Sequence, residues 1–104
     1  MIRVALIDDH AMVRAGFRML LEKEPGIEVV GEAEDGEQGL ALLRRLRPDV
    51  ALLDLHMPGL TGIEVTERVR RADLPTRLII LTVAGEAPFP RRLLEAGASG
   101  YLIK

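Results

Sequence analysis

Residues 50–54 read VALLD, four apolar residues followed by an aspartate, and they give the clearest indication of the fold. The run is short and does not alternate between polar and apolar residues. It therefore predicts a strand that is buried on both faces. Such strands are typical of parallel sheets, because the helices that connect parallel strands cover both faces of the sheet.

Four other short runs have the same character, and helix-like segments separate them. The runs occupy residues 4–7 (VALI), 27–30 (IEVV), 78–81 (LIIL) and 101–103 (YLI). In the first two helical segments the apolar residues share one face, as in an amphipathic helix; they are Val13, Phe17, Leu20 and Leu21, and then Gly39, Leu42, Leu43 and Leu46. Pro48 ends the second helix.

The third helix is expected over residues 62–71, where Val65 and Val69 lie one turn apart. A short fourth helix is expected over residues 90–96, because proline suits a first helical turn and Gly97 suits a C-terminal cap. Strands and helices thus alternate along the chain, which predicts an α/β fold with a doubly wound, five-stranded parallel sheet.

A fifth helix would be expected after residues 101–104, where the sequence stops. The first helix alone would then cover one face of the sheet. We therefore expect residues 1–104 to form one domain that is truncated at the end of its fifth strand. The alternative is a natural variant with four helices, which would leave much apolar surface exposed.

The composition excludes several classes of protein. The chain has 104 residues, one domain's worth, and a formal net charge of −2 from 16 acidic and 14 basic residues. No strong field therefore favours nucleic acid or an anionic membrane. Cysteine is absent, which excludes disulfides, thiol catalysis and thiolate metal sites. The N-terminus resembles no signal peptide, and no apolar stretch could span a bilayer, so we expect a cytoplasmic protein.

Reactive side chains follow the strands at their carboxyl ends, where doubly wound sheets bind ligands. Asp8 and Asp9 follow the first strand, Asp54 the third, Thr82 the fourth and Lys104 the fifth. Three carboxylates in one place repel one another unless a hard divalent cation is present. Mg²⁺ takes oxygen ligands and is usually shared with a phosphate, and a carboxylate can itself accept a phosphoryl group. The pattern indicates phosphoryl transfer with Mg²⁺.

Together these residues resemble the receiver domain of two-component response regulators. The resemblance rests on the five spaced elements Asp8-Asp9, Asp54, the loop 55–62 (LHMPGLTG), Thr82 and Lys104. Four local stretches look most like the NarL/FixJ (LuxR-type) subfamily; they are residues 4–10 (VALIDDH), 29–33 (VVGEA), 47–50 (RPDV) and 96–102 (AGASGYL). The resemblance implies a flavodoxin-like sheet with the strand order 2-1-3-4-5.

The resemblance also implies roles for individual residues. Asp54 would be the phospho-acceptor. Asp9 would bind Mg²⁺ directly, Asp8 mostly through water, and the backbone carbonyl of His56 would be a further ligand. Mg²⁺ would be the only cofactor. The domain would catalyse only its own phosphorylation and dephosphorylation, so we expect a regulatory domain and not a metabolic enzyme.

Three more residues would act in signalling. Thr82 would swing toward the phosphoryl group, Lys104 would pair with it, and Tyr101 would be the rotameric switch. The implied partners are a sensor histidine kinase and a helix-turn-helix output domain outside this chain that controls transcription. Separately, a homodimer could cover the apolar surface that the missing fifth helix would leave exposed. The domain itself would contact neither a membrane nor nucleic acid directly.

Some features depart from the family pattern or leave alternatives open. Residues 84–90 contain Pro88 and Pro90, which predicts a long loop and a late start of the fourth helix and leaves open whether switching is altered. A pseudo-receiver, an Mg²⁺-dependent phosphohydrolase and a flavin-binding module are the competing classes. His10 and His56 could indicate a transition-metal site; we interpret His10 as a polar residue that opens the first helix.

Overall fold

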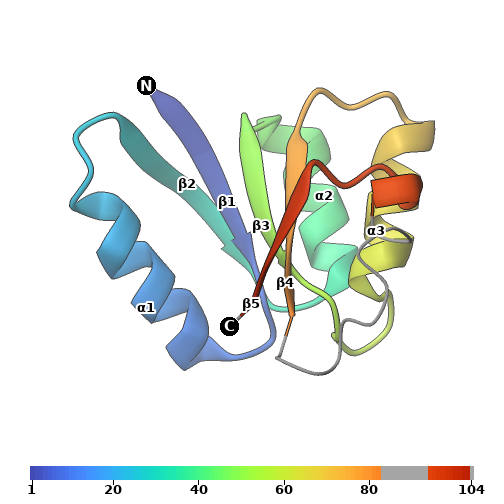
Figure 1. Cartoon of the computed structure of the whole chain (residues 1–104), viewed down its shortest axis with the longest axis horizontal. Helices are drawn as coiled ribbons and strands as arrows, with labels where there is room; N and C mark the ends of the chain where they lie inside the picture. The colour runs from blue at the N-terminus through green and yellow to red at the C-terminus, as the bar shows by residue number, and fades with distance from the viewer. Residues whose placement is uncertain (83–93, 104) are drawn as a thin grey trace.

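The computed structural model describes residues 1–82 and 94–103 (Figure 1). In chain order its elements are β1 (Ile2–Ile7), α1 (Ala11–Glu22), β2 (Ile27–Ala33), α2 (Gly36–Leu46), β3 (Val50–Asp54), α3 (Gly62–Arg71), β4 (Arg77–Thr82) and β5 (Gly100–Ile103). Residues 94–96 are also helical and fall within the expected fourth helix. Its expected start at Pro90, and the whole segment 84–90, lie outside the described residues.

The described strands form one parallel sheet in the order β2-β1-β3-β4-β5. The predicted fold class, a doubly wound α/β sheet of flavodoxin-like order, is confirmed. After β2 the chain returns to the other side of β1 to form β3. The strand order therefore reverses between β1 and β3, which is where open sheets of this kind bind ligands.

Helices lie on both faces of the sheet, with α2 and α3 on one side and α1 on the other (Figure 1). Successive strand residues alternate between the two faces. Ile7, Leu53 and Ile80 belong to the larger core cluster, which contains residues of α2 and α3. Leu6 and Leu52 belong to the smaller cluster, against which residues of α1 pack. The core thus has two unequal halves.

The α1 face is thinly covered. No residue of α1 is buried, and among the described residues no other helix lies on this face (Figure 1). On β5, Tyr101, Leu102 and Ile103 are all exposed. The prediction that this strand would be buried on both faces is wrong. Strand β5 is at one edge of the sheet, and α1 lies over β1 and β2, toward the opposite edge.

Local signals set the helix boundaries that the sequence predicts. Helix α3 begins at Gly62 because Thr61 and Glu64 form a capping box, with bonds of 3.2 Å from the Glu64 N–H to the Thr61 hydroxyl and 3.1 Å from the Thr61 N–H to the Glu64 carboxylate. A cap of this kind stabilises a helix by about 1 kcal/mol. Helix α2 ends at Leu46, and Arg47 follows with a positive φ of 44°. Pro48 then prevents any continuation.

Candidate functional site

Strand register brings the predicted acids to one edge of the sheet. Ile7 of β1 pairs with Leu53 of β3, so Asp8 and Asp54 follow at the same level of neighbouring strands. Asp8 and Asp54 are both buried, with 2% and 4% of their surface exposed. Because β1 and β3 are the neighbouring strands between which the strand order reverses, both acids stand at that point.

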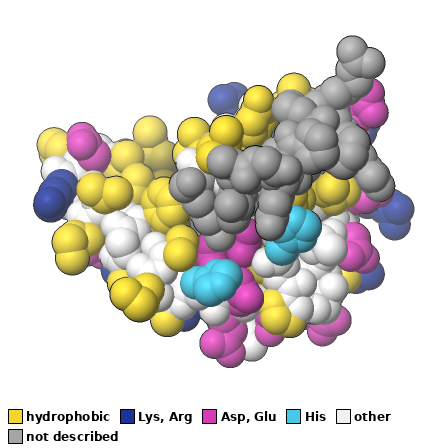
Figure 2. All heavy atoms as spheres, turned by 60° about the horizontal axis from the view of Figure 1, so that its bottom comes forward, with side chains coloured by type: hydrophobic (Ala, Val, Ile, Leu, Met, Phe, Trp, Pro, Cys, Tyr) yellow, Lys and Arg dark blue, Asp and Glu magenta, His cyan; other side chains and the backbone are white. Residues whose placement is uncertain are grey.

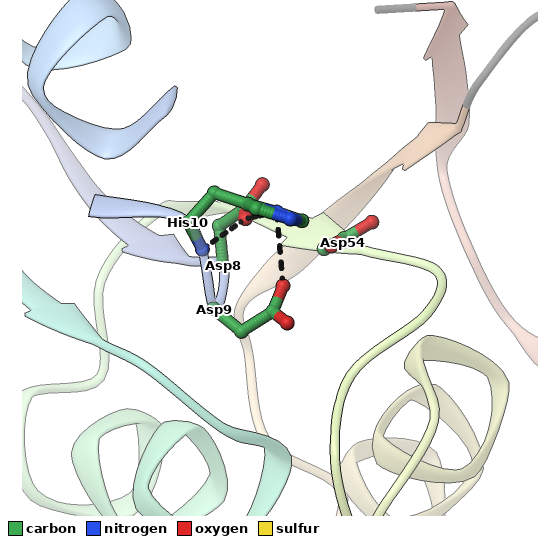
Figure 3. Close-up of side chains that lie close together, drawn as sticks. All are labelled: Asp8, Asp9, His10 and Asp54. Carbon is green, nitrogen blue, oxygen red and sulfur yellow. Dashed lines mark hydrogen bonds and ion pairs between the residues drawn. The ribbon is translucent and has the colours of Figure 1, made fainter. Parts of the chain in front are cut away.

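Asp8, Asp9, His10 and Asp54 form a compact cluster (Figure 3). Each side chain offers one ligand atom, and these atoms all lie within 4.8 Å of one another. Figure 2 shows acidic side chains gathered at this edge between two histidine side chains. Carboxylate oxygens at this spacing are the ligands that a hard divalent cation prefers. The cluster could hold such an ion.

The loop after Asp54 is shaped by close backbone approaches. The Leu55 N–H donates to the Leu81 carbonyl at 2.9 Å, and the Gly62 N–H donates to the Leu55 carbonyl at 2.8 Å. A Cβ at Gly62 would lie only 2.6 Å from the carbonyl oxygen of Asp54. Only glycine therefore lets α3 start against the end of β3. The His56 N–H points at Asp54 Oδ1 over a long 3.4 Å.

Thr82 and Tyr101 lie on the two strands beyond Asp54. Leu81 pairs with Asp54, so the buried Thr82 stands one residue further toward the same edge. Thr82 pairs with Ile103. Tyr101 pairs with Ile80 and is 38% exposed, which keeps its ring at the surface. Lys104 lies outside the described residues.

An ionic network that joins α1 to β2 and to the end of β1 was not foreseen from the sequence. Arg14 of α1 donates to the backbone carbonyl of Asp8, and its Nε donates to Glu32 of β2 at 3.1 Å. Arg18 also donates to Glu32, at 2.7 Å, and to Glu22 at 2.8 Å. Its hydrogen bond to Glu32, followed by that to Glu22, raises the pKa of the Arg18 guanidinium. The spacing of the two arginines, one helical turn apart, was the signal available.

The fold and the acidic cluster together define an α/β protein with a candidate cation site at the carboxyl edge of its sheet. The family model of the response regulator receiver domain matches residues 4–104. The chain therefore belongs to the response regulator receiver domain family, and its resemblance to the NarL/FixJ subfamily is confirmed.

Two curated relatives illustrate the match. The chain is 46% identical over 104 residues to response regulator GacA of Pseudomonas viridiflava, covering all of this chain and 49% of that protein. It is 47% identical over 104 residues to response regulator UvrY of Escherichia coli K12, covering all of this chain and 48% of that protein. The chain thus spans about half the length of the curated relatives it matches.

Solved structures agree with this membership. The receiver domain of the putative response regulator NarL from Mycobacterium tuberculosis superposes with a TM-score of 0.93 at 40% identity, covering 98% of this chain and 82% of that one. A two-component response regulator of the LuxR family from Aurantimonas gives 0.91 at 43% identity, with 98% and 73% covered. Within the described part of the chain, no helix is both long and apolar enough to cross a membrane.

Proposed function

We propose that this chain is the phospho-accepting receiver domain of a two-component response regulator, with Asp54 as the residue that takes the phosphoryl group. The observation that carries the proposal is the meeting of the β1 and β3 acids, whose ligand atoms lie within 4.8 Å of one another. Asp54 stands at the end of a central strand, where it pairs with Leu81 of β4 and follows Leu53, which pairs with β1. A nucleophile held this rigidly needs little reorganisation to react.

The donor set fits Mg²⁺. Asp9 and Asp54 would bind the ion through their carboxylates, the backbone carbonyl of His56 would be a third ligand, and Asp8 would act mostly through water. The cluster has one exposed acid, Asp9, and two buried ones, Asp8 and Asp54. One side of the site is therefore open to solvent, which suits an ion that keeps several bound waters. When bound, Mg²⁺ would supply most of the charge that neutralises the phosphoryl oxygens.

The chain's own residues would carry out the transfer. A carboxylate oxygen of Asp54 attacks phosphorus while the bond to the donor breaks, and the donor leaves with its electron pair. The donor would be a phosphohistidine of a sensor histidine kinase or a small acyl phosphate. Thr82 would donate its hydroxyl to one phosphoryl oxygen, and Lys104 would pair its ammonium with another.

The added phosphate would act as a switch. It adds a charge of about −1.5 to −2, which biases an equilibrium between two existing conformations. Thr82 would move toward the phosphate, and Tyr101, whose ring is already at the surface of an edge strand, would change rotamer. In a longer cytoplasmic protein, an output domain would convert this change into control of transcription, and a homodimer would form.

Mass spectrometry after incubation with acetyl phosphate and Mg²⁺ tests the proposal. We expect one added phosphoryl group on the wild-type chain and none on Asp54→Asn. The matched control is Asp73→Asn, because Asp73 is exposed and has a φ of 53°, a conformation that asparagine adopts well. Beryllofluoride with Mg²⁺ should bind stoichiometrically to wild type and to Asp73→Asn, but not to Asp54→Asn. A phosphoryl group on Asp54→Asn would show that another residue is the acceptor.

A further inference from the structure

The imidazole of His10 lies beside both acids that follow β1 (Figure 3). Its Nδ1 is 3.1 Å from Asp8 Oδ1 and also 3.1 Å from Asp9 Oδ1. The His10 backbone N–H donates to the same Asp8 oxygen at 2.8 Å. His10 occupies the N-cap position of α1, but its side chain makes no capping hydrogen bond. The ring is therefore directed at the carboxylates and not at the helix it precedes.

These two distances suit a hydrogen bond or an ion pair, and they also match the spacing of neighbouring ligands on one metal ion. With metal–ligand distances of about 2.1 Å, adjacent ligand atoms lie about 3.0 Å apart around an octahedral ion and about 3.4 Å apart around a tetrahedral one. The observed 3.1 Å from Nδ1 to each carboxylate oxygen lies between these values. A single N–H can point well at only one of the two oxygens, whereas one cation can bind all three atoms.

The donor chemistry distinguishes two kinds of ion. Mg²⁺ is bound through oxygen and makes no use of an imidazole, whereas Zn²⁺, Cu²⁺ and Ni²⁺ bind imidazole well. We propose that His10 gives this site a second binding mode, in which a borderline transition-metal cation such as Zn²⁺ is held by His10 Nδ1 together with Asp8, Asp9 and Asp54. The inference concerns the same acidic cluster as the proposed function and rests on it.

This mode would oppose phosphorylation. Zn²⁺ is almost always four-coordinate when protein side chains supply all its ligands, and here four ligand atoms lie within 4.8 Å of one another, so side-chain adjustments would bring them onto one ion. No coordination position would remain for a phosphoryl oxygen, and a carboxylate oxygen of Asp54 would be engaged as a ligand. Mg²⁺ leaves positions open because it keeps several waters. Transition-metal occupancy would thus inhibit the phosphoryl acceptance that Mg²⁺ supports.

Calorimetric titration of the metal-free chain with Zn²⁺ tests the inference. We expect His10→Ala to weaken Zn²⁺ binding at least about tenfold, since even loss of an outer-shell partner costs about 10–100-fold in metal affinity. The control is Asp73→Asn, because Asp73 is exposed, lies outside the cluster and is assigned no ligand role. It should leave Zn²⁺ binding within about twofold of wild type. Equal Zn²⁺ affinity in wild type and His10→Ala overturns the inference, as does an equal loss in Asp73→Asn.

Histidine NMR signals provide a reading that needs no variant. Addition of Zn²⁺ to the wild-type chain should shift the imidazole signals of His10 far more than those of His56. Equal shifts, or none at His10, overturn the inference even if His10→Ala fails to fold.

The outcome is separable from that of the proposed function. If the chain accepts phosphoryl groups with Mg²⁺ but Zn²⁺ binds without His10, only the second mode is lost. If Zn²⁺ binds through His10 but Asp54 is never phosphorylated with Mg²⁺, the proposed function and the inhibitory role of Zn²⁺ are lost, and only the metal site remains.

Discussion

Replacement of Asp9 by asparagine is expected to raise the stability of the metal-free protein and to lower its response to Mg²⁺. The ligand atoms of Asp9, Asp8 and Asp54 lie within 4.8 Å of one another. At that distance two unit charges in a water-like dielectric repel by about 0.9 kcal/mol. The water-like value applies because the Asp9 side chain is itself partly exposed.

The net effect follows from two opposing contributions. Neutralising Asp9 relieves two repulsive pairs, about 2 kcal/mol in total. The contact of Asp9 with His10 Nδ1 is weakened at the same time, which costs up to about 1 kcal/mol for an exposed pair. A net gain of about 1 kcal/mol corresponds to a rise in Tm of about 4–8 °C for a domain of this size.

Excess Mg²⁺ should reverse the order of the two melting temperatures, so that the wild-type protein melts above Asp9→Asn. An ion at a hundred times its dissociation constant stabilises a protein by about 2.7 kcal/mol, and Asp9→Asn removes one of the ligands that would provide this stabilisation. Thermal melts in a chelator and then in excess Mg²⁺ measure both effects, with Asp73→Asn as the control for a lost surface carboxylate. The reasoning fails if Asp9→Asn melts at or below the wild-type temperature in chelator, or if Mg²⁺ raises the Tm of both proteins equally.

Two further predictions concern helices α1 and α3, which follow the strands that carry the site. Gly62→Ala should destabilise the fold by about 1–3 kcal/mol, because the added Cβ would lie 2.6 Å from the Asp54 carbonyl oxygen. Gly16→Ala in α1 has open space around the added Cβ and should stabilise the fold by about 0.5–1 kcal/mol. Chemical denaturation that ranks the two variants the other way contradicts this prediction. Arg14→Met should lower the free energy of unfolding by about 1–3 kcal/mol, because the arginine side chain is only 16% exposed and donates hydrogen bonds to the Asp8 carbonyl and to Glu32. An unchanged urea midpoint would show that this side chain does not hold α1 to the sheet.

The order of elements and the positions of the acids could be predicted from the sequence. The apolar runs at 50–53 and 78–81 identify central strands, because a strand buried on both faces carries mainly apolar side chains. Once those strands are parallel, Asp54 and Thr82 must follow at the same edge of the sheet. The start of α3 was equally readable, since the capping box at Thr61 is a local feature.

Other properties depended on contacts between distant residues. The exposure of Leu102 and Ile103 follows from the place of β5 at the edge of the sheet, which an apolar run alone does not disclose. The pairing of Arg14 with Glu32 joins α1 to β2 across a separation of 18 residues. His10 stands at the N-cap of α1 as expected, and its ring also makes a local contact with the carboxylates of the two preceding residues, Asp8 and Asp9.

The sequence alone therefore determined which side chains stand at the carboxyl edge of the sheet. Strand periodicity and the hydrophobic effect are properties of short segments, and they decide where each strand ends. Only the tertiary structure decided how far apart the ligand atoms of the two strands lie and how thinly one face is covered. Those quantities depend on how separate segments pack together, and no short stretch of sequence carries that information.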